Sequence, residues 1–99
     1  MKFIIVTTAK FDKWFKSIKD KTTRYRLESK INQVARGNFG DHKPIDSNIG
    51  ELRFFFAGGI RIYYTIRGNE IVLLLNGGDK STQSKDIATA KGLFSQLGE

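Results

Sequence analysis

The segment at positions 50–80, GELRFFFAGGIRIYYTIRGNEIVLLLNGGDK, constrains the fold of this chain more than any other stretch. Its β-branched and aromatic residues form three runs, and glycines stand where the chain must reverse direction. We therefore predict three consecutive strands at 51–56, 60–67 and 71–76. Gly68 and Asn69 suit a two-residue hairpin loop, because both residue types adopt positive φ readily.

Alternation along these strands separates an apolar face from a polar one. The apolar face receives alternate residues of the first two strands: Leu52, Phe54, Phe56, Ile60, Ile62, Tyr64 and Ile66. The other face receives the residues between them: Glu51, Arg53, Phe55, Arg61, Tyr63, Thr65 and Arg67. The run at 71–75 is apolar on both faces, which favours a central strand. We expect the face with Arg53 and Arg61 to stay open and to carry the function, with Phe55 covered by a partner or by the last helix.

A further strand and two helices precede this sheet. The apolar run at 3–6 predicts a short buried strand. Apolar residues then recur at helical spacing in two segments: Phe11, Trp14, Phe15 and Ile18, followed by Leu27, Ile31, Val34 and Ala35. The tight connection at 20–23 predicts an antiparallel helical hairpin over the apolar face of the sheet. The lysines of the first helix are either its solvated back or a basic surface for RNA: Lys10, Lys13, Lys16 and Lys19.

A last helix follows Ser81 and Thr82, and its apolar stripe is Ile87, Ala90, Phe94 and Leu97. The predicted fold is α+β, one domain at 1–99 in the order β-α-α-β-β-β-α. It has a twisted, mainly antiparallel four-stranded sheet, a helical hairpin on one face and a C-terminal helix. Glycines, Lys80, Lys85 and a helix start together can bind phosphate, although the spacing of a P-loop is absent.

The charge of the chain indicates its partners. Seventeen Lys and Arg residues against ten Asp and Glu give +7 over 99 residues. This excess favours nucleic acid or an acidic protein, although surface lysines also serve solubility alone. With no cysteine and one histidine, disulfides are excluded and a metal centre is disfavoured. We find no signal peptide or membrane-length apolar run, and we expect a cytoplasmic protein without a cofactor.

Residues 38–49, NFGDHKPIDSNI, form the long loop of the prediction. His42 could act as a general acid or base, because its ordinary pKa lies near neutrality, or it is a bystander in a polar loop. Pro44 restricts the backbone of Lys43 before it. We therefore assign Lys43 to a phosphate contact and place His42 beside it in RNA binding.

Four runs, GNFGDHKP, GELR, GGIRIYY and LLLNGGDKSTQSKDI, occur in an order and spacing that resemble the RelE/ParE superfamily of toxins. Within that superfamily they are similar to the HigB-like group called addiction module killer proteins, over essentially the whole chain. The resemblance implies the toxin of a type II toxin–antitoxin module, neutralised by a small helix-turn-helix antitoxin encoded beside it. RelE-like members cleave messenger RNA on the ribosome, and ParE-like members poison DNA gyrase. Similarity to the HigB-like group implies the ribosome-dependent endoribonuclease, which arrests translation and growth.

The resemblance also implies roles in metal-independent cleavage, in which the 2′-hydroxyl attacks the adjacent phosphate. Arg61 matches the family's arginine in the middle strand and would stabilise the phosphate charge, with Arg53 assisting. Lys80 matches the basic position after the last strand and would stabilise charge or donate a proton. The tyrosine near the end of RelE has no counterpart here, and Lys85 and Asp86 stand in that region.

The base that takes the 2′-hydroxyl proton is left among Glu51, Asp86 and a lysine of lowered pKa. Glu51 could instead form a cross-strand ion pair with an arginine of the sheet. Tyr63, on the polar face, could stack on an RNA base, and Lys85 could bind phosphate.

Two other functions stay open. A gyrase poison of the same fold needs no phosphate-centred residues, so Arg61→Ala would leave its toxicity intact. A regulatory or nucleic-acid-binding module without catalysis would bind RNA in a salt-dependent manner, without product and without growth arrest.

Overall fold

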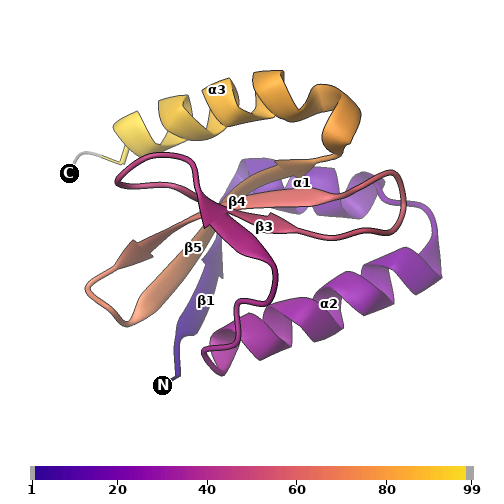
Figure 1. The fold of residues 1–99 in the computed structure, drawn as a ribbon, viewed down its shortest axis with the longest axis horizontal. Helices are drawn as coiled ribbons and strands as arrows, with labels where there is room; N and C mark the ends of the chain where they lie inside the picture. Colours follow the sequence, from indigo (N-terminus) through magenta and orange to yellow (C-terminus); the bar gives the residue numbers. More distant parts are fainter. Residues whose placement is uncertain (1, 98–99) are drawn as a thin grey trace.

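The structure, a computed structural model, describes residues 2–97 and places three α-helices and five β-strands in that range (Figure 1). The elements are β1 (Ile4–Thr7), α1 (Ala9–Ser17), α2 (Lys21–Ala35), β2 (His42–Pro44), β3 (Gly50–Arg53), β4 (Arg61–Arg67), β5 (Ile71–Gly78), a 3₁₀ turn (Lys80–Thr82) and α3 (Gln83–Ser95). The α+β class is confirmed. Within the same range, no helix combines the length and the apolar character needed to cross a membrane.

The sheet has five strands in the order β1-β5-β4-β3-β2, so the prediction of four strands is wrong. The added strand, β2, lies inside the predicted loop and pairs antiparallel with β3, with Lys43 opposite Glu51. Its residues are exposed and include Pro44. Proline has no backbone N–H to donate to a neighbouring strand, so it fits an edge strand. The sheet is mainly antiparallel, as predicted, and only the β1–β5 pair is parallel.

The strand β1 is an edge strand, and the prediction that it is buried is wrong. Ile4 is 65% exposed, and Val6 is also exposed. The reason is that β1 pairs on one side only, with β5. β5 has strands on both of its sides, which confirms the interior position that its apolar run predicted.

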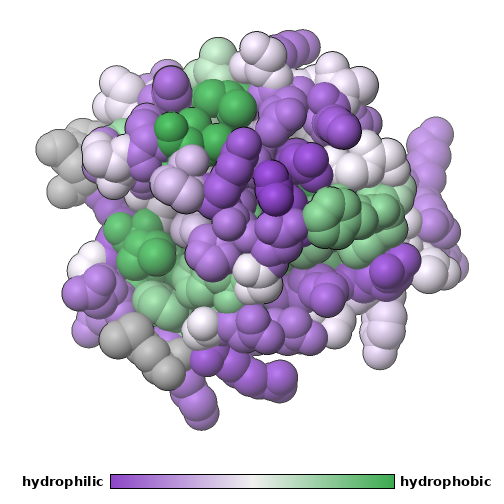
Figure 2. Space-filling model, in the orientation of Figure 1, coloured by the Kyte–Doolittle hydropathy of each residue, from purple (hydrophilic) through white to green (hydrophobic). Residues whose placement is uncertain are grey.

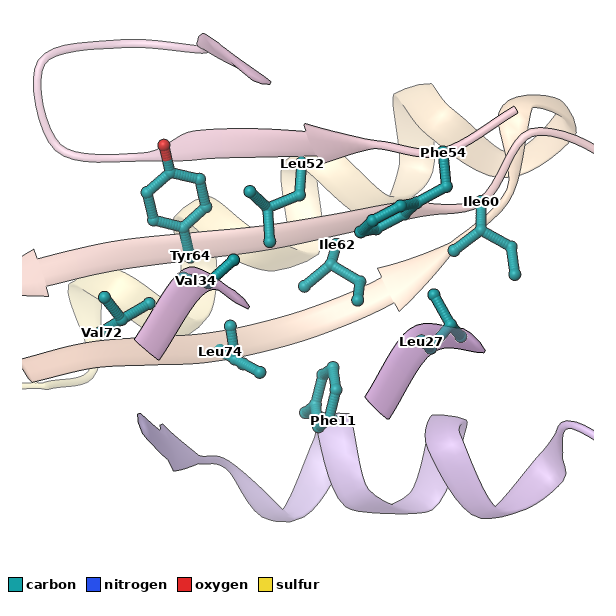
Figure 3. Close-up of a cluster of buried hydrophobic side chains, with 10 residues drawn as sticks. All are labelled: Phe11, Leu27, Val34, Leu52, Phe54, Ile60, Ile62, Tyr64, Val72 and Leu74. Carbon is teal, nitrogen blue, oxygen red and sulfur yellow. The ribbon is translucent and has the colours of Figure 1, made fainter. Parts of the chain in front are cut away.

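Helices α1 and α2 cover the apolar face of the sheet, as predicted. The ten buried side chains of this core come from both helices, from β3, β4 and β5, and from the two ends of the β3–β4 loop: Phe11, Leu27, Val34, Leu52, Phe54, Ile60, Ile62, Tyr64, Val72 and Leu74 (Figure 3). Thr8 begins α1 by accepting a hydrogen bond from the backbone N–H of Phe11. Gly77 lets α1 approach, because a Cβ at that position would lie 2.5 Å from the ring of Trp14.

Helix α3 covers the opposite face of the sheet, so the prediction of an open polar face is wrong (Figure 1). A second buried cluster joins β4, β5, α3 and the residue before β3: Ile49, Tyr63, Leu73, Leu75 and Ala90. The physical reason is the apolar content of β5, whose leucines give the stripe of α3 a surface to pack on. The polar residues of β3 and β4 therefore lie beneath or beside a helix.

The reversal at Gly68 and Asn69 is confirmed, since both residues have positive φ, 59° and 58°. The N–H of Glu70 closes the turn on the carbonyl of Arg67. The first predicted strand is shorter than expected, because β3 ends at Arg53 and residues 54–60 form a loop.

Candidate functional site

A group of polar side chains lies where β3 and β4 run beneath the start of α3. In the register of these strands, Glu51 is opposite Tyr63 and Arg53 is opposite Arg61, so all four project to the side of α3. Glu51 and Tyr63 are fully buried, and Arg61 is 7% exposed. Burial of a carboxylate and a guanidinium together is uncommon unless they are paired.

The Arg61 guanidinium is held by the β3–β4 loop. Its Nη1 donates to the carbonyl oxygens of Gly59 and Ile60 at 3.3 Å and to that of Phe54 at 3.5 Å. Its Nε lies 3.9 Å from Oε2 of Glu51. This ion pair is the one that the sequence left as an alternative to catalysis, and it also fixes the direction in which the guanidinium can meet an anion.

Gln83 connects Glu51 to α3, and sequence reasoning missed it. Its Nε2 donates a 2.7 Å hydrogen bond to Oε2 of Glu51. The sequence does contain a signal for this contact, because Gln83 lies one helical turn before Ile87 and therefore on the side of α3 that faces the sheet. The first turn of α3 is thereby tied to the buried carboxylate.

Four buried side-chain atoms in the part of the chain that the structure describes make no hydrogen bond within the protein. They are Glu51 Oε1, Arg61 Nε, Tyr63 OH and Asn76 Oδ1. Each unpaired buried group costs about 1–3 kcal/mol, and natural folds keep only a few of them per hundred residues. Their concentration beneath one helix end is typical of a functional site, where local rules of stability are broken.

Tyr63 stays protonated in this surrounding. Burial raises the pKa of its phenol well above the ordinary value, and the nearby carboxylates of Glu51 and Asp86 raise it further. The expectation that Tyr63 stacks on an RNA base is corrected here, because its ring is enclosed between the sheet and α3.

Asp86, in the first turn of α3, lies over the strand next to Arg61. Its Oδ2 accepts a 2.5 Å hydrogen bond from Thr82 Oγ1. Gly78 is the register partner of Arg61, and a Cβ on Gly78 would lie 1.8 Å from that same Oδ2. Asp86 is half-buried, so it can be reached from solvent while α3 stays in place.

Lys80 joins this group from the 3₁₀ turn. Gly59 stands between it and Arg61, because a Cβ on Gly59 would lie 3.4 Å from Lys80 Cβ and 3.7 Å from Arg61 Nη1. The backbone N–H of Lys80 donates to the carbonyl of Gly58, which holds the turn against the β3–β4 loop. Lys80 is exposed, so its ammonium is available to a ligand.

The structure separates the remaining candidates from this group. Arg53 turns to Asp41, with Nη2 3.2 Å from Oδ1. Lys43 lies on the edge strand β2, exposed and opposite Glu51. His42 lies on the other face beside Phe39, with its Nδ1 2.8 Å from the carbonyl of Gly40.

Two further points concern the helix start. Lys85 points to the α1 side, where it lines a groove with Lys10 and Lys13. The N–H of Ser81 is already taken by the Asp79 carboxylate, and this side-chain hydrogen-bonding lowers the pKa of Asp79. The predicted phosphate position at this turn is therefore occupied by a carboxylate of the chain itself.

Within residues 2–97, no three His, Cys, Asp or Glu side chains gather in a way that could hold a metal ion.

The group therefore brings together two cations, Arg61 and Lys80, and two carboxylates, Glu51 and Asp86. Cations beside a reachable carboxylate can bind a phosphate and move a proton. The buried carboxylate, in contrast, is placed to hold the arginine.

Comparison with known proteins gives a relative and a fold. No family model matches the chain. An uncharacterized protein of Haemophilus influenzae is 42% identical over 94 residues, which is 95% of each chain. Among solved structures, a free mutant of the E. coli toxin RelE has a TM-score of 0.74, with 15% identity over 93% of this chain and 97% of its own. The RelE mutant in complex with a peptide of the antitoxin RelB has a TM-score of 0.65, with 14% identity over 87% and 95% of the two chains. At such identities these two structures establish the RelE-like fold.

Proposed function

The chain belongs to one family with this Haemophilus influenzae protein and has the RelE-like fold, and from this premise we propose that it is a toxin that cleaves messenger RNA on the ribosome. One observation carries the proposal: Lys80 lies across Gly59 from Arg61, and Asp86 lies against Gly78, the register partner of Arg61. The net charge of +7 favours a polyanionic substrate. The HigB-like subgroup stays a prediction.

In the proposed reaction, the 2′-oxygen of one nucleotide attacks the adjacent phosphorus. The 2′-oxygen–phosphorus bond forms, the phosphorus–5′-oxygen bond breaks, and the products carry a 2′,3′-cyclic phosphate and a 5′-hydroxyl. Asp86 takes the proton of the 2′-hydroxyl, because it is the reachable carboxylate of the group. Arg61 stabilises the charge on the phosphorane, and Lys80 gives a proton to the leaving 5′-oxygen.

Glu51 is a positioning residue in this scheme. It is fully buried and already accepts a hydrogen bond from Gln83. Its carboxylate lies 3.9 Å from the Arg61 guanidinium and restrains it. The choice among the three predicted bases therefore falls on Asp86, on grounds of access.

The proposed partner is a small antitoxin with an acidic segment. The RelE mutant of similar fold binds a peptide of its antitoxin RelB. Here the cations around the β3–β4 loop would attract such a segment. A neighbouring gene for a small helix-turn-helix protein would agree with this partner, and a solitary gene would count against it.

The test incubates the purified protein with programmed ribosomes and maps breaks in the message by primer extension. Arg61→Ala and Lys80→Ala should both remove the breaks, and exposed Lys91→Ala on α3 serves as the matched control. Lys80→Ala is essential to the design, because Lys80 is exposed and its loss leaves the fold intact, whereas Arg61→Ala leaves Glu51 unpaired in the interior.

Gyrase poisoning is the alternative that one observation favours. Three backbone carbonyls engage the Arg61 Nη1, which suits a structural arginine as well as a phosphate ligand. An intact message, together with growth arrest and inhibited DNA supercoiling, would transfer the proposal to gyrase.

A further inference from the structure

A cavity of about 370 Å³ lies between α2 and the β3–β4 loop, on the α2 side of the sheet. Arg26 and Lys30 line it from the helix, and three consecutive phenylalanines at 54–56 line it from the loop. Figure 2 shows a hydrophobic patch at the right of the view, where Figure 1 places this loop, with hydrophilic residues around it. The candidate site described above uses only one of these residues, through the carbonyl of Phe54 that accepts from Arg61.

Phe55 is the exposed wall of this cavity. Its side chain is 81% exposed, so the last helix does not cover it, and cover by a partner, the other expectation from the sequence, stays a prediction. The cause is the early end of β3 at Arg53, after which the chain bends through positive φ at Ala57, Gly58 and Gly59. Phe55 and the partly exposed Phe56 form an apolar patch with charged residues at its rim, and such patches are typical of ligand-binding surfaces.

The charges around the cavity favour an anion. The Arg26 guanidinium lies 3.9 Å above the ring centre of Phe56, which fixes its position. Lys30 follows Arg26 by four residues and therefore projects from the same side of the helix. Asp41, the carboxylate among the lining residues, is already paired with Arg53. The positive charge of Arg26 and Lys30 is thus left for a ligand.

We propose that this cavity is a subsite for one nucleotide of single-stranded RNA. The base stacks on Phe55, and Arg26 and Lys30 bind the phosphate next to it. A positive groove with an exposed aromatic ring is the arrangement by which proteins bind single strands without reading sequence. The volume is near the lower end of ligand pockets, which suits one nucleotide better than a folded protein segment.

The cavity and the candidate site meet at one strand pair, the cavity on the side of α2 and the site on the side of α3. Arg53 lines the cavity, and its register partner is Arg61. A message held by its scissile phosphate at Arg61 would have to pass around the β3–β4 loop to place a flanking nucleotide on Phe55. This part of the inference rests on the proposed function, whereas binding of RNA by the cavity can be measured without it.

The test titrates the whole protein with the hexanucleotide r(A)6 and follows backbone amide shifts by NMR. The shifts should concentrate at the lining residues of the cavity. Phe55→Ala should weaken binding about 5- to 150-fold, the range for one stacked base, and Phe55→Trp should retain it. Tyr25→Ala is the matched control, because Tyr25 is 74% exposed on α2 and does not line the cavity. Lys30→Ala should reduce the slope of log affinity against log salt by about 0.7.

Equal binding of r(A)6 by Phe55→Ala and Tyr25→Ala would overturn the subsite, and so would shifts confined to other surfaces. A Phe55→Ala variant that binds r(A)6 as the native chain does, but is no longer neutralised by a co-expressed antitoxin, would also overturn the subsite. That result would favour a protein-binding cavity. The proposed nuclease fails separately: Phe55-dependent binding without any break on ribosomes leaves the subsite standing. If Phe55→Ala changes neither the breaks in the message nor the binding of r(A)6, the nuclease proposal stands and the subsite fails.

Discussion

Gly78 carries the most specific structural prediction, because the first turn of α3 is packed directly on it. A methyl group at this position would lie 1.8 Å from Asp86 Oδ2 and 2.8 Å from Thr82 Oγ1. Asp86 would have to rotate away and give up its hydrogen bond from Thr82. Overpacking of this kind costs about 1–3 kcal/mol, and the stiffer unfolded chain returns about 0.4–1 kcal/mol. We therefore expect Gly78→Ala to lower the free energy of unfolding by about 1–2 kcal/mol, and Tm by roughly 5–15 °C.

The assay is urea denaturation and thermal melting, with Gly92→Ala as the matched control. Gly92 lies within α3, and a Cβ there would meet nothing within 4 Å. Gly92→Ala should therefore raise stability by about 0.5–1 kcal/mol, the helix cost of glycine. In an Asp86→Ala background, the effect of Gly78→Ala should shrink, since the contacted carboxylate is gone. Gly78→Ala with a stability equal to or above that of the native chain would refute the contact and, with it, the placement of Asp86 beside Arg61.

Three further predictions concern the site and the helix that covers it. Because burial raises the pKa of Tyr63, the folded state keeps a proton that the unfolded chain releases near pH 10, so stability should fall as pH rises above about 10. Tyr63→Phe should make this fall shallower, and an unchanged alkaline profile in denaturation curves would contradict the assignment. Asp79→Ala removes the carboxylate that caps the turn on Ser81 and should cost about 0.5–2 kcal/mol in urea denaturation; no loss would show that the cap is dispensable. Arg61→Ala should lower the free energy of unfolding by about 3–5 kcal/mol, because Glu51 is left buried without its ion pair. Adding Glu51→Gln should recover part of that loss, and a double variant no more stable than Arg61→Ala would count against the pair.

The parts of the fold that follow from side-chain alternation could be predicted from the sequence. Ile60, Ile62 and Tyr64 alternate with Arg61 and Tyr63, and they do face α1 and α2. The same parity placed Glu51 and Arg61 on one side of the sheet, where the structure finds them. Period alone decides which face a residue occupies, so these predictions needed no tertiary information.

The burial of the candidate site could not be predicted in this way. Whether a face is open depends on which helix packs on it, and the apolar stripe of α3 does not by itself say which surface it packs against. The strand β2 escaped notice because its three exposed residues show no apolar period and pair through their backbone. Likewise, the pairing of Arg53 with Asp41 joins residues twelve positions apart, and no local pattern signals it.

The most direct test of the central claim is single-turnover cleavage of a message on programmed ribosomes, with the product ends identified. The native chain should give discrete breaks with 5′-hydroxyl ends. Asp86→Asn and Lys80→Ala should each slow the reaction about 10²- to 10⁴-fold, the usual contribution of a general acid or base, and Lys91→Ala should leave it unchanged. An intact message, or breaks formed equally fast by Asp86→Asn and Lys80→Ala, would contradict the assignment of catalysis to this group of residues.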